Sequence, residues 1–215
     1  MLKILLVNIL KLHNLCYRYA GALAIHYEGI HPKHRLMKYK EWFLEQITSD
    51  DIVLDIGCNI GGMPKIFSGK AKFIYGVEIE SKLVADARKY NHAPNIEYIH
   101  DDATTMDYSD LRPVSVITLS NVLEHIEDRK EFLTSIASRV NWRDSKHMRF
   151  LIRVPMIDRD WITLYKKELG VEWRLDTTHY TEYTLQQFQE ELAASNIQIE
   201  DLEIRYGEIY AICRR

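Results

Sequence analysis

Cysteine is scarce in this sequence. Cys16, Cys58 and Cys213 are the only three, and no two of them have C-x-x-C spacing. An odd number of widely separated cysteines excludes a disulfide framework and gives no zinc-site pattern. We therefore expect a protein of a reducing compartment, the cytoplasm.

Long uninterrupted apolar runs are also missing. Residues 1–24 begin like a signal peptide, but Asn8, Lys11 and Arg18 break the apolar segment, so neither a signal peptide nor a spanning helix is expected. Apolar residues at helical spacing instead predict an amphipathic helix. Such a helix could cover its own domain, which is the role we favour, mediate self-association or lie on a membrane.

Acidic residues are nearly absent from residues 1–40, which hold seven Lys/Arg and one acid, Glu28, although the whole chain has a net charge of −3. A basic N-terminal segment can contact an anionic membrane, an anionic substrate or an acidic partner. A solvated basic face is the alternative. The charge of the remaining chain gives no reason to expect a nucleic-acid partner.

The dinucleotide-binding pattern G-x-G-x-x-G is absent as well. The apolar run of residues 52–54 predicts a buried strand, and the pattern Asp55-x-Gly57-x-Asn59-x-Gly61 follows it. Pro64 then suits the first turn of a helix. Strand, glycine turn and helix together predict a ligand-binding turn at the carboxyl end of a sheet.

This pattern resembles the first motif of class I S-adenosylmethionine-dependent methyltransferases, with Asn59 in place of the usual middle glycine. The cofactor carries a cationic sulfonium and an ammonium but no phosphate, so an acid such as Asp55 suits it electrostatically. The resemblance implies S-adenosylmethionine as cofactor.

Strand and helix patterns alternate through the rest of the chain, which predicts a parallel doubly wound sheet. Further strands are expected over 73–78, 95–99, 114–121 and 149–155, and the last two over 197–204 and 208–213. The resemblance implies an α/β, Rossmann-like, mostly parallel seven-stranded sheet with an antiparallel last strand. We expect a helical cap or lid over 1–48, including a helix over 35–47, and a methyltransferase domain over 49–215.

Acids and small residues stand at the ends of successive predicted strands. By resemblance, Glu78 accepts hydrogen bonds from the ribose, Ile79 lies against the adenine and Asp102, rather than Asp101, accepts from the adenine amino group. The backbone near Ser120 is expected beside the methionine part. The full set of predicted cofactor residues is Asp55, Gly57, Cys58, Asn59, Gly61, Glu78, Ile79, Asp102, Ala103, Ser120 and Asn121.

Residues 155–183 form an insertion that mixes aromatic, acidic and basic side chains, which suits a polar sugar or a phosphorylated substrate. Structured surface packing is the alternative. The predicted substrate residues are Arg153, Asp158, Asp160, Trp161, Tyr165 and Arg174. His179 is the predicted general base, because its ordinary pKa suits proton removal near neutrality.

Metal binding is a weaker alternative, and our main prediction is that the protein uses none. Glu124 and His125 resemble the acid–histidine pair with which some methyltransferases hold a divalent ion, and His179 could supply a third ligand. However, Asn121 stands where an E-x-x-E-H motif has its first acid.

The sequence thus predicts a methyltransferase that methylates an oxygen of a small molecule or of a surface-polysaccharide sugar. The alternatives are a membrane-associated lipid or quinone methyltransferase and a non-catalytic module that binds the cofactor. Nucleic acid is not expected as a substrate, because no N/D-P-P-Y/F motif follows the fourth strand. The basic N-terminal segment leaves peripheral membrane contact open.

Overall fold

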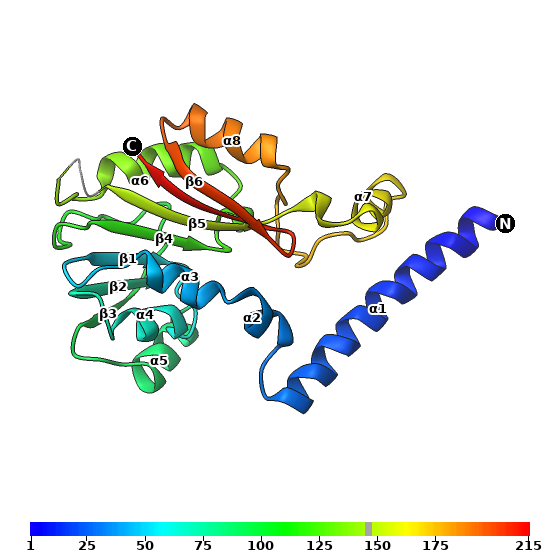
Figure 1. Cartoon of the computed structure of the whole chain (residues 1–215), viewed down its shortest axis with the longest axis horizontal. Helices are drawn as coiled ribbons and strands as arrows, with labels where there is room; N and C mark the ends of the chain where they lie inside the picture. The colour runs from blue at the N-terminus through cyan, green and yellow to red at the C-terminus, as the bar shows by residue number, and fades with distance from the viewer. Residues whose placement is uncertain (145–147) are drawn as a thin grey trace.

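A seven-stranded sheet forms the centre of the protein (Figure 1). The computed structural model describes residues 1–144 and 148–215. The strand order is β3-β2-β1-β4-β5-β7-β6. The strands are β1 (Ile52–Ile56), β2 (Phe73–Glu78), β3 (Ile96–His100), β4 (Val116–Ser120), β5 (Arg149–Pro155), β6 (Gln198–Arg205) and β7 (Glu208–Arg214).

The first five strands are parallel, whereas β7 runs antiparallel to both β5 and β6. This confirms the predicted fold class, including the antiparallel last strand. The central strands are buried on both faces, as their continuous apolar runs predict. Because β1 to β5 point the same way, the loops that follow β1, β2 and β4 meet at one edge of the sheet.

Helices cover both faces of the sheet. On one face lie α6 (Arg129–Arg139) and α8 (Leu185–Ala194), whose apolar side chains join the larger core cluster with Leu54 and Ile117. On the other lie α4 (Gly62–Phe67) and α5 (Ser81–Tyr90), which Figure 1 shows below the sheet. This arrangement is the doubly wound one that the alternating pattern predicts.

Three helices precede the sheet: α1 (Leu2–Glu28), α2 (Pro32–Met37) and α3 (Tyr39–Glu45). The prediction of one continuous helix over 35–47 is therefore wrong. Lys38 adopts a left-handed conformation (φ 49°) that ends α2 and precedes α3. Trp42 and Phe43 of α3 are buried against the sheet. Residues 39–45 thus belong to the core, although they fall within the predicted cap of residues 1–48.

Helix α1 lies beyond α7 (Trp161–Glu168), away from the sheet (Figure 1). Its contacts with the body are few: Leu10 is buried, His13 Nδ1 lies 3.0 Å from Lys166 Nζ, and Asn14 donates to the Glu172 carbonyl at 2.6 Å. Most of its apolar side chains are exposed. No helix in the described residues is long and apolar enough to cross a membrane.

The insertion after β5 contacts the hairpin of β6 and β7. The N–H of Met156 donates to the Gly207 carbonyl at 2.9 Å. Gly207 has a positive φ of 75°, and a Cβ there would lie 2.3 Å from Arg159 Cβ. The hairpin turn and the short 3-10 helix η3 (Ile157–Arg159) are therefore in direct contact.

Candidate functional site

A cavity of about 940 Å³ opens at the carboxyl ends of the parallel strands. Its walls come from the loops after β1, β2, β3 and β4, from α6, and from residues 176–180 of the insertion. Open α/β sheets bind ligands at this edge. The volume is at the upper end of the range that holds a small-molecule ligand.

The glycine loop forms one wall of the cavity. Gly57 has a φ of 67°, and a Cβ there would lie 2.8 Å from Val122 Cγ2, so a side chain has no room. Asn59, in place of the usual glycine, also has a positive φ of 52°. Asparagine tolerates this left-handed conformation better than most residues, which explains how the loop keeps its shape without that glycine.

Glu78 lies at the end of β2, lines the cavity and is 8% exposed. Its Oε2 accepts from the Asn59 N–H at 2.9 Å, and its Oε1 accepts from the Glu80 N–H at 3.1 Å. The carboxylate therefore stands where a ribose would meet it, and it also holds the glycine loop against β2. This second role was not predicted from the sequence.

Asp55 is buried beneath the cavity and is not one of its lining residues. The Thr118 hydroxyl donates a short hydrogen bond to its Oδ1. Burial, and secondarily the charge of Glu78, raise the pKa of Asp55 to about 7. In this structure Asp55 thus joins β1 to β4, and its predicted contact with a cofactor remains a prediction.

The other predicted cofactor residues divide into two groups. Five line the cavity with Gly57 and Glu78: Asn59, Ile79, Asp102, Ala103 and Asn121. Cys58, Gly61 and Ser120 lie behind its surface, and burial raises the pKa of the Cys58 thiol. Asp101 lines the cavity as well, so the preference for Asp102 remains a prediction.

The predicted substrate residues lie outside the cavity lining. Asp160 caps α7 by accepting from the Thr163 N–H at 2.7 Å, and Arg174 pairs with Glu172 at 2.8 Å. Arg153 is buried and pairs with Glu208 at 2.9 Å. The remaining three are Asp158, Trp161 and Tyr165. Asp160, Arg174 and Arg153 are engaged in holding the insertion and β5. Substrate contacts by these six residues remain predictions.

Three cavity residues of the insertion were not among the predicted site residues: Asp176, Thr178 and Tyr180. They come from the loop before α8, and the N–H of Tyr180 donates to the Glu124 carbonyl at 2.8 Å, which fixes this loop beside β4. Asp176, three residues before the predicted base, was the available signal.

The charge of the cavity is one-sided. Eight carboxylates line it, and the lining holds no lysine or arginine among the residues the structure describes. The acidic residues are Glu78, Glu80, Asp101, Asp102, Glu127, Asp128, Glu131 and Asp176. Such a site attracts cationic ligands and repels phosphates.

His179, the predicted base, is 6% exposed and is not one of the lining residues. Its Nδ1 lies 3.0 Å from Glu182 Oε1, and its ring packs edge-on against His125 at 4.7 Å. His125 lines the cavity, and burial, followed by the proximity of His179, lowers its pKa. Whether His179 removes a proton remains a prediction.

The sheet order, the antiparallel β7 and the glycine loop define the fold of class I S-adenosylmethionine-dependent methyltransferases. Residues 28–202 match the model of a methyltransferase-domain family. The chain belongs to this family, whose cofactor is S-adenosylmethionine. Helix α1 lies almost entirely outside the matched region.

An uncharacterised protein of Methanocaldococcus jannaschii is 29% identical over 117 residues, which is 53% of this chain and 45% of that protein. The chain matches less than half the length of each curated relative considered. The shared sequence therefore covers only part of this chain and less than half of each of these proteins.

Solved structures share the fold. Magnesium protoporphyrin IX methyltransferase from Synechocystis PCC 6803, solved with S-adenosylhomocysteine, aligns with a TM-score of 0.61 at 16% identity over 85% of this chain and 83% of that one. The [4+2]-cyclase SpnF aligns with a TM-score of 0.65 at 16% identity over 83% and 80%. The second name shows that this fold also carries chemistry other than methyl transfer.

Proposed function

We propose that this protein transfers the methyl group of S-adenosylmethionine to an oxygen of a small molecule or of a surface-polysaccharide sugar. The observation that carries the proposal is the acidic cavity at the carboxyl edge of the sheet. A cationic sulfonium and ammonium suit eight carboxylates, whereas a dinucleotide pyrophosphate would be repelled. The glycine loop and Glu78 supply the close backbone approach and the acceptor atoms that an adenosine needs.

The negative charge of the cavity also limits which methyl acceptors can bind. A neutral polyol, sugar or phenol can enter a cavity lined by carboxylates, while a phosphate-rich chain such as RNA meets repulsion. We therefore favour a neutral acceptor group over the phosphorylated substrates that the sequence leaves open. Tyr180 and Thr178 come from the insertion and line the cavity, and they are our candidates for contacting the acceptor.

Methyl transfer is an in-line displacement at a good leaving group, so the protein mainly aligns the two reactants. For an oxygen acceptor, a nearby base removes the proton as the bond forms. In our proposal His179 removes this proton, unless a metal ion bound at the same place activates the acceptor oxygen.

Calorimetry with S-adenosylhomocysteine tests the cofactor half of the proposal, and we expect micromolar affinity, about −8 kcal/mol. Transfer of a labelled methyl group tests the acceptor half, using neutral sugars, polyols and phenols against quinols, lipids and RNA. Labelled neutral acceptors support the proposal. Tight cofactor binding without transfer to any acceptor favours a non-catalytic module, and labelling of lipid, quinol or RNA alone overturns the acceptor class.

We further propose that α1 contacts an anionic membrane surface while the domain stays cytoplasmic. Leu2, Leu5, Ile9 and Leu12 are each more than half exposed and share one helix face. Lys3, Lys11 and Arg18 precede the first acid, Glu28, so the helix is positively charged along most of its length. Apolar insertion combined with cationic attraction is the way in which interfacial helices bind.

Flotation with vesicles tests this contact. The protein should float with vesicles containing phosphatidylserine and much less with neutral phosphatidylcholine vesicles, and high salt should weaken the interaction. Leu5→Asp combined with Leu12→Asp should abolish flotation. Failure to float with either vesicle, or dimerisation that the double variant removes, would exclude the membrane role in favour of self-association.

A further inference from the structure

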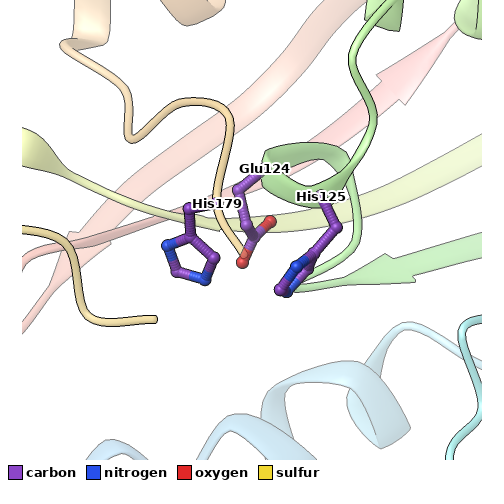
Figure 2. A group of neighbouring side chains, drawn as sticks. All are labelled: Glu124, His125 and His179. Atoms are coloured by element: carbon purple, nitrogen blue, oxygen red, sulfur yellow. The ribbon is translucent and has the colours of Figure 1, made fainter. Parts of the chain in front are cut away.

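Glu124, His125 and His179 form a cluster (Figure 2), and of the three His125 lines the cavity. Their potential ligand atoms all lie within 4.8 Å of one another. Glu124 and His125 come from the 3-10 helix η1 (Leu123–His125) after β4, and His179 comes from the loop before α8. The hydrogen bond from the Tyr180 N–H to the Glu124 carbonyl fixes the two segments side by side.

The Glu124 carboxylate needs a partner that the described protein atoms do not supply. Glu124 is fully buried, and neither of its carboxylate oxygens has a hydrogen-bond partner within the described parts of the chain. Buried carboxylates are costly unless they are paired, protonated or bound to a metal. Figure 2 shows this carboxylate between the two imidazole rings.

A hydrogen-bond chain orients the His125 ring. The Thr178 hydroxyl donates to Asp176 Oδ1 at 2.8 Å, so its hydrogen is already committed. Thr178 Oγ1 also lies 3.0 Å from His125 Nδ1, and it must act there as the acceptor. His125 Nδ1 therefore carries the proton, and Nε2 keeps its lone pair.

Glu182 orients the second ring in the same way. Its Oε1 lies 3.0 Å from His179 Nδ1, so a carboxylate accepts the Nδ1 proton and leaves Nε2 with its lone pair. Glu182 is itself fixed by the ion pair with Arg159 and by the N–H of Leu175. Carboxylates and hydroxyls that hold Nδ1 in this manner are the usual outer partners of metal-binding histidines.

We propose that Glu124, His125 and His179 bind one divalent transition-metal ion through the carboxylate and the two Nε2 atoms. Two imidazoles and one carboxylate suit Zn²⁺, Co²⁺, Fe²⁺ or Mn²⁺, whereas Mg²⁺ and Ca²⁺ prefer oxygen ligands alone. The acidic cavity that His125 lines would favour the arrival of a cation. The site stands on its own residues, so it does not depend on the identity of the methyl acceptor.

Metal binding can be measured directly on the full-length protein. After treatment with a chelator and its removal, calorimetry with Zn²⁺ should give one site per chain, and Co²⁺ should produce visible absorption bands typical of nitrogen and oxygen ligands. We expect much weaker binding of Mg²⁺ at the same concentration.

Variants locate the site. His125 is exposed, so His125→Ala should leave the fold intact and lower Zn²⁺ affinity at least tenfold, as should Glu124→Gln. Thr178→Val keeps the side-chain shape but removes the acceptor of the His125 proton, and a loss of about 10–100-fold is expected. His92→Ala, at an exposed histidine between α5 and β3, is the matched control and should bind as the wild type does.

Equal Zn²⁺ affinity in folded wild type, His125→Ala and Glu124→Gln would overturn the site and leave Glu124 as a buried protonated carboxyl. Absence of Zn²⁺ and Co²⁺ binding by the folded wild-type protein would also overturn it. Loss of metal binding in His125→Ala with unchanged S-adenosylhomocysteine affinity supports the site. Because none of these binding measurements requires a methyl acceptor, failure of the proposed reaction would not be confused with failure of the metal site.

Discussion

The carboxylate of Glu78 accepts the N–H of Asn59 at 2.9 Å, so the end of β2 holds the glycine loop that follows β1. The residue predicted to recognise the cofactor is thus also one that shapes the loop around it. A single substitution at Glu78 should therefore affect the site through two contacts, one with the ligand and one with the backbone.

Glu78→Gln should weaken S-adenosylhomocysteine binding about 10–100-fold, because hydrogen bonds to a charged acceptor contribute about 1.5–3 kcal/mol. Calorimetry measures this directly. Glu97→Gln, an exposed carboxylate on the neighbouring strand β3, is the control and should bind normally. Unchanged S-adenosylhomocysteine affinity in Glu78→Gln would show that neither the ligand contact nor the loop contact of this carboxylate contributes to binding.

Asp55 should make stability depend on pH. Its folded pKa of about 7 lies above its ordinary value, so the protonated form is favoured by folding. The stability that it contributes is present at low pH and is lost as pH rises through about 7. Asp55→Asn removes this dependence while keeping an acceptor for the Thr118 hydroxyl.

Urea unfolding of wild type and Asp55→Asn at pH 5 and pH 8 measures the effect. From pH 5 to pH 8 the variant should gain about 2–3 kcal/mol of unfolding free energy relative to wild type. If the unfolding free energies of the two proteins differed by the same amount at pH 5 and at pH 8, Asp55 would have an ordinary pKa in the folded state.

Gly61→Ala should destabilise the domain by about 2–4 kcal/mol. Its φ is 82°, which costs an alanine about 1–2 kcal/mol, and its Cβ would lie 2.3 Å from Tyr98 Oη, which adds an overpacking cost. Gly170→Ala is the matched control, because its φ of 68° is similar but nothing lies within 4 Å of the added Cβ. Thermal or urea unfolding should show a clearly larger loss at Gly61, and equal losses would contradict the contact with Tyr98.

Removal of residues 1–28 should leave a cooperatively folded domain, because Leu10 is the buried residue of α1. Removal of residues 1–45 should abolish cooperative unfolding, because it takes Trp42 and Phe43 out of the core. Circular dichroism during urea unfolding measures whether each truncated protein unfolds cooperatively. Two truncated proteins that behave alike would show that α3 is as separable from the domain as α1.

Local sequence rules predicted most of the sheet and several helix ends. The apolar runs gave the parallel strands, and Thr184 and Gln187 form the expected capping box of α8, each side chain bonding the other's backbone N–H. Asp128 caps α6 through the Glu131 N–H. These features depend on neighbours within a few residues, which is why the sequence alone reveals them.

Features that depend on distant contacts were missed. Lys38 splits a predicted helix through a left-handed backbone that no local pattern signals. Helix α7 went unrecognised because its apolar, aromatic and basic residues lack a clear stripe, although Asp160 caps it. Tyr180 reaches the cavity because its backbone bonds to Glu124, more than fifty residues away in the chain.

The contact between Gly207 and Arg159 has an evolutionary consequence. The turn of the β6–β7 hairpin leaves no space for a side chain at residue 207, and the same turn accepts the Met156 N–H. A longer or bulkier turn would displace residues 156–159, which begin the insertion that supplies Asp176, Thr178 and Tyr180 to the cavity. Homologues that change this hairpin should therefore also change residues 156–159, and the two segments should diverge together when acceptor preference diverges.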